Sequence, residues 1–431
     1  MDNKTNIFQI VLLCILGASL VIGVLVFGGI IPGFRGDNVN INKNVTMWGT
    51  FPAGELTLLI DEINRTNKDN FLITYRQKTK DTFEQELIDA LARGQGPDLV
   101  LIDDSMIVRY SDIIAPLPFS SLSARDYRDL FVDGSQIFLI SDGTLAVPLT
   151  VDPLVMYYNK DLYIQSGIIQ PPKNWSAFLV NHQKLNSVTN QGFIEQSGVA
   201  FGYFSNIANA KEILTTLLLQ VGTPIVEYTD QLGYRVVLSG NTDAVSAVDF
   251  FARFSTPGRA EYSWNASLPE AKTRFSQGTL AHYFGFASEL SSLREINPNL
   301  NLDVALVPST TEGKPSVSYG RFSGVSVLKA SKNPTVAYQA MVAFADRENS
   351  ASFSEVVGLP PVRRDLLGKE RIDPYRDVFI QAAVTAKAWF DPNPIASRGL
   401  FDQMIQRVVT GVTNPSEAMV ALNSQLNNLF K

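Results

Sequence analysis

The sequence contains little of the residue chemistry on which many enzymes depend. Among its 431 residues there is one cysteine, Cys14, and there are two histidines, His182 and His282. It also lacks a Gly-x-Ser-x-Gly nucleophile elbow and a Walker-type glycine loop. These absences exclude an intramolecular disulfide and argue against nucleophilic triads and histidine-rich metal sites. We therefore expect no enzymatic activity, no cofactor and no bound metal.

The sequence has no basic run long enough to follow a nucleic-acid backbone. Its formal net charge is −6, with 36 Lys and Arg against 42 Asp and Glu. Nucleic acid is a poor partner for such a chain, because clustered basic side chains are needed to neutralise phosphates. The length and the 45% hydrophobic content predict a sizeable core divided among about two or three folding units.

The longest stretch without charge lies at the N-terminus. From Ile7 to Phe34 the residues are apolar, small or uncharged, and this run exceeds the roughly 20 residues that span a bilayer. It predicts a retained single-pass transmembrane anchor at 7–34, after a short segment at 1–6 and before a polar tether at 35–43; a cleaved helix is the alternative. Cys14 follows the bulky Leu13, which favours an ordinary membrane-helix cysteine over a lipidated one.

Beyond the tether, strand and helix patterns alternate, which predicts an α/β fold with largely parallel sheets. Two segments, Glu55 to Asn64 and Phe83 to Leu91, carry apolar residues at helical spacing, so each is expected to bury one face. The expected core residues are Leu56, Leu59, Ile60 and Ile63 in the first segment and Phe83, Leu87, Ile88 and Leu91 in the second.

The stretch from Ala146 to Trp175 is the most informative part of the chain. It reads as two short β-favouring runs, Ala146 to Leu149 and Pro153 to Tyr158, separated by Asp152, with Pro153 fixing the backbone angle just after it. Asn159-Lys160-Asp161 then caps a short helix, and Gly167 ends it. Pro171-Pro172 then predicts an extended segment before Trp175 and a cap at Ser176.

This order of elements resembles the extracellular solute-binding proteins of ABC importers, in particular the maltose-binding-protein-like group. The resemblance continues along the chain in the order that the family shows, from about Asn44 to Lys431. It includes Val45 to Thr50 (VTMWGT), Ala92 to Asp104 (ARGQGPDLVLIDD), Phe275 to Ala287 (FSQGTLAHYFGFA), Val304 to Pro308, Ser331 to Pro334 and Gly358 to Asp365 (GLPPVRRD).

The resemblance implies a periplasmic-binding-protein type II fold with two discontinuous lobes. Lobe 1 would comprise residues 44–150 and 308–346, and lobe 2 residues 152–306 and 355–431. The hinge would lie near Asp152 and Pro308, and the ligand would sit between the lobes, at the carboxyl ends of the strands. The charges that flank the membrane segment leave its orientation open, whereas the resemblance places the large domain outside the cell membrane.

Loop residues with aromatic rings or polar groups are the candidate ligand contacts, because sugars offer apolar faces for stacking and hydroxyls for hydrogen bonds. The candidates are Trp48, Asp103, Asp104, Asp152, Tyr203, Asn206, Tyr283, Phe284, Phe286, Tyr319, Arg321 and Trp389.

Each candidate also has a structural alternative. Asp152 could only stabilise the hinge, and Arg321 could form a surface ion pair. Trp389 could cover a helix pair. Of Tyr283 and Phe286, one is expected in the core and one at the cleft, because neighbouring strand residues alternate between faces.

Several other motifs favour structural roles. Of Asp103 and Asp104, one is expected to cap the next helix while the other is solvated or bonds ligand hydroxyls. Tyr157-Tyr158 is assigned to the scaffold and not to an iron site, and Trp175 is assigned to packing. The loop Gly285 to Ser288 lacks the tryptophan that many sugar binders of the family carry, which weakens the case for a carbohydrate.

The expected function is that of a membrane-anchored extracytoplasmic receptor. It would capture a small polar solute, such as a sugar or oligosaccharide, by lobe closure and deliver it to ABC permease subunits. The alternatives are a sensor that signals through a partner, a binder of peptides or polyamines, and an enzyme, which would need a carboxylate pair at a suitable separation in the cleft.

Overall fold

The computed structural model describes residues 43–229, 233–368 and 373–431, and residues 44–431 form one compact unit. The predicted transmembrane segment at 7–34 lies outside the described residues, as do the segment at 1–6 and the tether up to residue 42. Within the described ranges, no helix has both the length and the apolar character that crossing a membrane requires.

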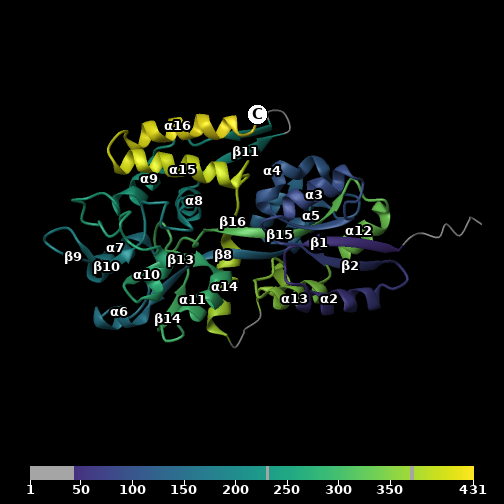
Figure 1. The fold of residues 1–431 in the computed structure, drawn as a ribbon, viewed down its shortest axis with the longest axis horizontal. Helices are drawn as coiled ribbons and strands as arrows, with labels where there is room; N and C mark the ends of the chain where they lie inside the picture. Colours follow the sequence, from purple (N-terminus) through teal and green to yellow (C-terminus); the bar gives the residue numbers. More distant parts are fainter. Residues whose placement is uncertain (1–42, 230–232, 369–372) are drawn as a thin grey trace, which may run out of the picture. The chain divides into compact units, whose positions relative to one another are not determined.

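The described residues form a mixed α/β structure (Figure 1). The strands are β1 (Asn44–Gly49), β2 (Leu72–Gln77), β3 (Leu99–Asp103), β4 (Ile114–Ala115), β5 (Leu117–Pro118), β6 (Leu139–Ile140), β7 (Gly143–Thr144), β8 (Val147–Asn159), β9 (Ser187–Val188), β10 (Ile194–Val199), β11 (Val226–Thr229), β12 (Gly233–Val236), β13 (Leu280–Phe286), β14 (Leu302–Ala305), β15 (Ser318–Leu328) and β16 (Ala386–Lys387).

The α-helices are α2 (Ala53–Thr66), α3 (Phe83–Ala92), α4 (Ile107–Tyr110), α5 (Ala124–Leu130), α6 (Lys160–Gln165), α7 (Trp175–Leu185), α8 (Ala210–Gln220), α9 (Thr242–Arg253), α10 (Ala271–Ser276), α11 (Leu290–Ile296), α12 (Pro334–Ala343), α13 (Arg347–Val357), α14 (Pro374–Thr385), α15 (Pro394–Val409) and α16 (Pro415–Asn428). Short 3-10 helices are η1 (Asp104–Met106), η2 (Ser111–Ile113), η3 (Asp133–Phe138), η4 (Ala287–Glu289) and η5 (Arg364–Leu366).

One sheet runs through the whole unit, with the strand order β2-β1-β3-β15-β8-β13-β10-β9. The pairs β1–β2, β1–β3 and β10–β13 are parallel, whereas β8 pairs antiparallel with β13, β14 and β15, and β15 pairs antiparallel with β3. The α/β class is therefore confirmed, but the prediction of largely parallel sheets is wrong. Long strands that cross the centre of the molecule pair antiparallel with their neighbours on both sides.

Strand β8 is a single strand of 13 buried residues. The prediction of two short runs interrupted at Asp152 and Pro153 is wrong, because both residues continue the ladder opposite Arg321 and Gly320 of β15. The cap predicted at Ser176 is wrong, because Asn174 caps α7 and its Oδ1 accepts a hydrogen bond from the Ala177 N–H at 2.9 Å. Two other local signals after β8 are confirmed. Asn159 Oδ1 accepts hydrogen bonds from two N–H groups of α6, and Gly167 adopts φ +66° just after that helix.

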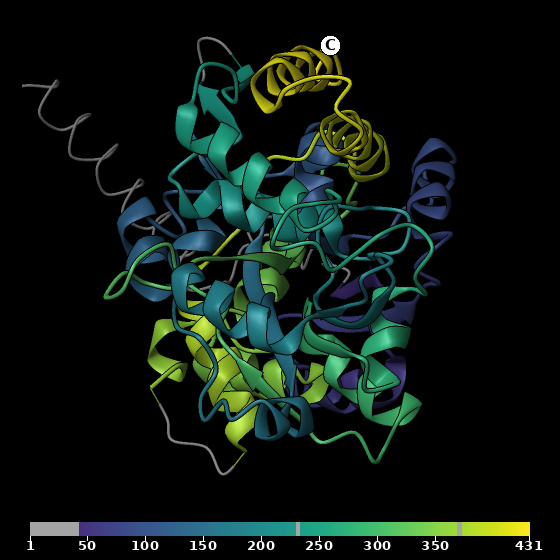
Figure 2. The same ribbon diagram turned by 90° about the vertical axis from the view of Figure 1, so that its left-hand side faces the viewer.

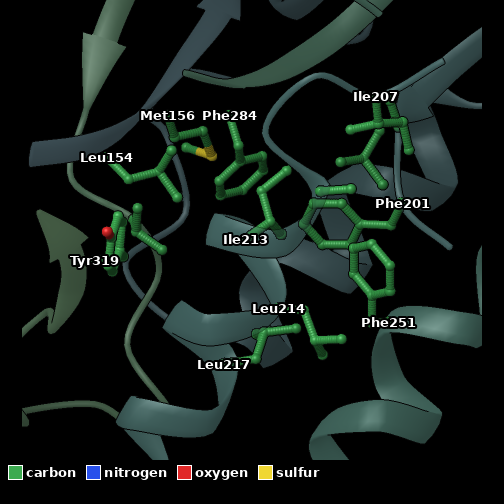
Figure 3. Packing of buried hydrophobic residues seen from close by; sticks show 14 of the residues in the cluster. Leu154, Met156, Phe201, Ile207, Ile213, Leu214, Leu217, Phe251, Phe284 and Tyr319 are labelled. Atoms are coloured by element: carbon green, nitrogen blue, oxygen red, sulfur yellow. The ribbon is translucent and has the colours of Figure 1, made fainter. Parts of the chain in front are cut away.

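The described core residues form three clusters. Two lie around β1, β2 and β3 at one end of the crossing strands and are taken together here, and the third lies at the other end. The β1–β3 core surrounds β1, β2 and β3 and includes Leu56 and Val100, and the β8–β13 core surrounds β8, β10 and β13. Figure 3 shows part of the β8–β13 core, in which Phe201, Phe284 and Ile213 lie close together. We refer to these two cores by these names below.

The helices nearest the N-terminus largely follow the predicted pattern. Leu56, Leu59, Ile60 and Ile63 are all buried on α2, as predicted. On α3, Phe83 and Leu87 are buried, but Ile88 is 46% exposed, so its assignment to the core is wrong. Successive helix residues are rotated by 100° about the helix axis, so position 88, which directly follows the buried Leu87, lies at the edge of the apolar face.

The C-terminal part of the chain contacts both cores. Phe353 of α13 packs in the β1–β3 core, as does Val362, and Arg363 forms an antiparallel bridge with Phe131. Residues 353–363 therefore pack against the β1–β3 core. The last helices, α15 and α16, pack side by side and contact α9 (Figures 1 and 2).

Candidate functional site

A cavity of about 550 Å³ opens at the carboxyl ends of β1 and β3. Its lining comes from the residues after these strands, from the region around the start of α3 and from the start of α15. The lining residues are Thr50, Phe51, Lys80, Asp81, Phe83, Glu84, Leu101, Ile102, Asp103, Ser105, Met106, Arg109, Asn393, Pro394 and Ile395. Open α/β sheets bind their ligands at this edge, so we take this cleft cavity as the candidate ligand site.

The chain enters the cleft cavity from β1 through a close approach at Gly49. A Cβ atom at this position would lie 2.7 Å from Leu101 Cδ1, which leaves no room for a larger residue unless Leu101 moves. Thr50 and Phe51 follow in the cavity wall. The hydroxyl of Tyr75 donates a hydrogen bond to the Phe51 carbonyl at 2.8 Å, so the neighbouring strand β2 holds this loop in place.

Asp103, at the end of β3, both lines the cleft cavity and caps the following 3-10 helix. Its Oδ1 accepts a hydrogen bond from the Ser105 N–H at 3.0 Å and a second one from the Ser105 hydroxyl. The second carboxylate oxygen is not used by this cap. The expected capping role therefore falls to Asp103, and one of its oxygens remains for a ligand hydroxyl.

An ion pair forms the side of the cleft cavity at α3 and α4. Arg109 and Tyr110 both donate hydrogen bonds to the carboxylate of Glu84, with distances of 2.9 Å from Arg109 Nη2 and 2.8 Å from the Tyr110 hydroxyl. Burial opposes ionisation of Glu84, but these hydrogen bonds outweigh it and lower the pKa of the carboxyl. Glu84 and Arg109 thus largely neutralise each other.

Another part of the lining is the end of a segment that we call the strap, residues 387–395, which leads from β16 into α15. Asn393 caps α15, because its Oδ1 accepts hydrogen bonds from the N–H groups of Ile395 and Ala396, both at 3.1 Å. Ile395 is 87% exposed and lines the cleft cavity. An apolar side chain this open to solvent offers a surface for a ligand ring.

A buried charged cluster anchors the middle of the strap. Lys211 Nζ of α8 lies 2.7 Å from Asp391 Oδ2, and it also donates to the Pro394 carbonyl and the Ser397 hydroxyl, both at 3.2 Å. The Asn393 N–H donates to Asp391 Oδ1 at 3.1 Å. The position of the Asn393–Ile395 wall therefore depends on this cluster.

Asp104 lies behind the cleft cavity, next to the crossing strand β15. Its two carboxylate oxygens accept hydrogen bonds from the Phe322 N–H at 2.8 Å and from the Tyr319 hydroxyl at 3.2 Å. Burial, reinforced by the adjacent Asp103, raises the pKa of Asp104 to about 8. Asp104 and Tyr319 therefore link β3 to β15, and Asp104 is buried, not solvated.

Asp152 and Arg321 pair across β8 and β15 at the predicted hinge. Asp152 accepts hydrogen bonds from the Ser288 N–H at 3.0 Å and from the Ser288 hydroxyl at 2.6 Å, and burial raises the pKa of Asp152. The Arg321 guanidinium lies 3.6 Å from the ring centroid of Phe286 and 3.4 Å from Glu212 Oε1. The Arg321 side chain stays 42% exposed.

Tyr283, Phe284 and Phe286 are all buried on β13. The Tyr283 hydroxyl donates to Glu289 at 2.6 Å, and Phe284 stacks on Trp175 at 5.9 Å between ring centroids. The expected division of Tyr283 and Phe286 between core and cleft is not seen, because this strand has neighbours on both faces. Trp175 is a packing residue, as predicted.

Asn206 has its side-chain groups occupied within the β8–β13 part of the molecule. Its Nδ2 donates to the carbonyls of Asn265 and Leu268 at 2.9 and 3.0 Å, and its Oδ1 accepts from the Trp264 indole at 2.9 Å. This network ties the loop that carries Asn206 to residues 264–268.

The remaining candidates lie outside the cleft cavity. Trp48 is 7% exposed, with Lys78 Nζ 3.8 Å from its ring centroid. Tyr203 is half-buried against the β8–β13 core. Trp389 is 3% exposed and contacts Phe401 edge to face. Of the twelve candidates, only Asp103 lines the cleft cavity, whereas Asp104, Asp152, Tyr319 and Arg321 meet behind it.

Sequence reasoning missed most of the cleft cavity lining. Thr50 and Phe51 follow Trp48 just after the end of β1, and the end of this strand was the signal that could have identified them as lining residues. Ile395 follows Pro394 at the start of α15, and no local pattern distinguishes it from other exposed apolar residues. Among the described residues, no group of three or more His, Cys, Asp or Glu side chains is placed to hold a metal ion.

The crossing strands, the two cores and a cavity at strand ends define an α/β protein whose fold matches that of two-lobe solute-binding proteins. The chain belongs to the family of bacterial extracellular solute-binding proteins, whose sequence model matches residues 59–375.

Curated relatives agree with this assignment. A binding protein of Brucella abortus (strain 2308) is 23% identical over 71% of each chain. The sn-glycerol-3-phosphate-binding periplasmic protein UgpB of Escherichia coli O1:K1 is 21% identical over 91% of this chain and 94% of its own. Both relatives are named as binding proteins.

Among solved structures, the cyclic α-maltosyl-1,6-maltose binding protein from Arthrobacter globiformis has the same fold. The TM-score is 0.75 at 16% sequence identity, and the similarity covers 90% of this chain and 99% of that protein. The predicted family and the predicted fold of the maltose-binding-like group are thereby confirmed.

Proposed function

We propose that this protein is an extracytoplasmic substrate-binding protein that captures a neutral sugar or oligosaccharide and delivers it to an ABC transporter permease. The cleft cavity carries this proposal. Its walls combine apolar surfaces, such as Phe51 and Ile395, with carboxylate, hydroxyl and amide groups, such as Asp103, Ser105 and Asn393. Sugars need both kinds of partner at once.

The charge of the cleft cavity favours a neutral ligand over a phosphorylated one. Its lining holds three acidic residues, Asp81, Glu84 and Asp103, against two basic ones, Lys80 and Arg109. Arg109 is already paired with Glu84. A phosphate would therefore face an excess of negative charge, although the relative from Escherichia coli is named for sn-glycerol 3-phosphate.

Ligand capture would occur by closure of two lobes about the hinge near Asp152 and Pro308. We propose that lobe 1 comprises residues 44–150 and 308–346, together with the following segment up to residue 367, which packs on it. Lobe 2 comprises residues 152–306 and the C-terminal helices. The strands β8 and β15 connect the lobes. A ligand that contacts Asp103 on one side and Ile395 on the other would favour the closed arrangement.

Anchoring to the membrane is part of the proposal. The uncharged run at 7–34 supports a single-pass helix, and the family assignment supports an extracytoplasmic position for the remainder. A receptor tethered in this way would stay close to its permease.

The test is calorimetric titration of the full-length protein with maltose, maltotetraose and mannobiose, alongside sn-glycerol 3-phosphate, spermidine and a tetrapeptide. We expect saturable binding of at least one neutral saccharide and none of the phosphate. Small-angle scattering at saturation should show compaction. Binding of spermidine or of the peptide alone would replace the sugar assignment, and an unchanged scattering profile would contradict lobe closure.

A further inference from the structure

A second cavity, of about 330 Å³, lies at the other end of the strap. Residues 387–390 of the strap line it, whereas residues 393–395 line the cleft cavity. The rest of its wall comes from η3, from the end of α8 and from the turn before β11. We call it the junction pocket, because Ile137 belongs to the β1–β3 core and Val226 and Trp389 belong to the β8–β13 core.

The lining of the junction pocket suits a planar apolar ligand. Ile137, Leu219 and Val226 contribute aliphatic surface, and Trp389 and Phe390 contribute rings. Trp389 is 3% exposed, so its ring is held rigidly by its neighbours. Rigid rings and aliphatic side chains in a concave pocket bind aromatic groups with little cost in side-chain entropy.

The charged residues of the junction pocket favour an anion. Asp133 is already neutralised by Arg364, whose Nη2 lies 2.7 Å from Asp133 Oδ1. Lys387 also lines the pocket, and no carboxylate of the described residues lies within ion-pair distance of it. An ammonium group beside an apolar surface is matched by a ligand that carries a ring and a carboxylate.

The wall of the junction pocket also contains a strained turn. Ile225 lies between the lining residues Pro224 and Val226, is fully buried and has φ +59°. The Val226 N–H bonds to the Pro224 carbonyl, which closes the turn around Ile225. A β-branched residue in the left-handed region is unfavourable, and such strain collects at binding sites more than elsewhere.

We propose that the junction pocket is a second ligand site, which takes a small aromatic carboxylate. The ring lies against Phe390, and the carboxylate pairs with Lys387. This site shares no lining residue with the cleft cavity.

The test uses 2-naphthoate as the anionic probe and 2-naphthylmethanol as its neutral counterpart, each titrated into the full-length protein without any saccharide. We expect saturable binding of 2-naphthoate at one site and about tenfold weaker binding of the alcohol. Lys387→Met should weaken 2-naphthoate about tenfold and leave the alcohol unchanged. The control Lys332→Met, in an exposed loop, should change neither. Failure of 2-naphthoate to saturate the wild type would overturn the proposal.

A second variant tests the location of the site. Gln136→Trp places a large ring at a half-buried position of the pocket lining and should abolish binding of both probes. If the Gln136→Trp protein folds and still binds both probes normally, the site is not in the junction pocket and the proposal is overturned. If this variant does not fold, the Lys387→Met comparison decides whether the probe binds there. Because no saccharide is present, these results are independent of the outcome at the cleft cavity.

Discussion

Lys211 Nζ lies 2.7 Å from Asp391 Oδ2, and the two side chains are only 8% and 5% exposed. This ion pair joins α8 to the middle of the strap. On one side of Asp391 the strap lines the junction pocket, and on the other side it lines the cleft cavity. A single buried ion pair therefore helps to position the walls of both cavities.

Replacing Lys211 should destabilise the protein strongly. Lys211→Met leaves the Asp391 carboxylate buried without its counter-ion, which costs about 3–5 kcal/mol. Lys211→Met combined with Asp391→Asn should recover a large part of this loss, because the charge is removed while the amide oxygen still accepts from Asn393. Urea unfolding measures both variants.

The matched control for this ion pair is an exposed one. Arg125 and Asp129 lie 3.7 Å apart, with side chains that are 89% and 71% exposed. Arg125→Met should change the unfolding free energy by less than about 0.5 kcal/mol. If Lys211→Met and Arg125→Met lower the unfolding free energy by equal amounts, burial of the Lys211–Asp391 pair does not contribute to stability.

Ile395 should affect ligand binding without affecting stability. Ile395→Asp removes an apolar surface and adds a carboxylate to a cavity that already holds an excess of acidic residues. We expect the affinity for the saccharide that binds the wild type to fall at least about tenfold, with little change in melting temperature because the side chain is 87% exposed. Val420→Asp, at a 54% exposed position of α16, is the control and should bind normally.

The buried histidines should make the protein less stable in acid. Burial lowers the pKa of His182 to about 4 and that of His282 to about 3. Below pH 6.5 the unfolded chain takes up protons that the folded protein refuses, so stability falls as the pH decreases. Each histidine contributes a loss on the order of 1.4 kcal/mol per pH unit between pH 6 and 5. Urea unfolding at these pH values should show a smaller loss for His182→Gln.

Asp104 should have the opposite effect on stability, and make the folded protein more stable as the pH decreases from 7 to 5. Its pKa of about 8 means that the folded protein holds a proton that the unfolded chain releases above pH 4. Its contribution to stability therefore falls as the pH rises to 8. Asp104→Asn removes this term and keeps an acceptor for the Phe322 N–H. The variant should lose stability more steeply than the wild type from pH 7 to 5, and an identical slope would contradict a protonated Asp104.

Two glycines should respond in opposite ways to alanine. A Cβ at Gly198 would lie 2.2 Å from His182 Nδ1, so Gly198→Ala forces the buried ring or the strand to move and should cost about 1–3 kcal/mol. Gly399 is exposed within α15 and has no atom within 4 Å of the added carbon. Gly399→Ala should stabilise by about 0.5–1 kcal/mol. Thermal unfolding of both variants measures the contrast, and a neutral Gly198→Ala would refute the close contact with His182.

Much of the fold could be predicted from short stretches of sequence. The cap at Asn159, the end of α6 at Gly167 and the buried face of α2 depend on residues within one or two helical turns, and all three are confirmed. The interruption of β8 at Asp152 and Pro153 was wrong, because pairing with β15 overrides the local turn preference of an Asp-Pro pair.

The residues of the candidate site were harder to predict from short stretches of sequence. Tyr283 and Phe286 are both buried because Tyr283 packs against Phe275 of α10 and Phe286 packs against Tyr319 of β15. Arg321 lies over Phe286 through contact between two distant strands. No local pattern reports which of these side chains remains open to a ligand.

The sequence by itself determined the class of the protein, because the order of its strands, caps and turns is a local property that persists along the chain. Only the tertiary structure decided which residues form the cavities. Thr50 and Ile395 line the same cavity although they are far apart in sequence, and the strap that connects the two cavities is positioned by Lys211 and Asp391. Burial and long-range packing decide such contacts, and these depend on the whole folded chain.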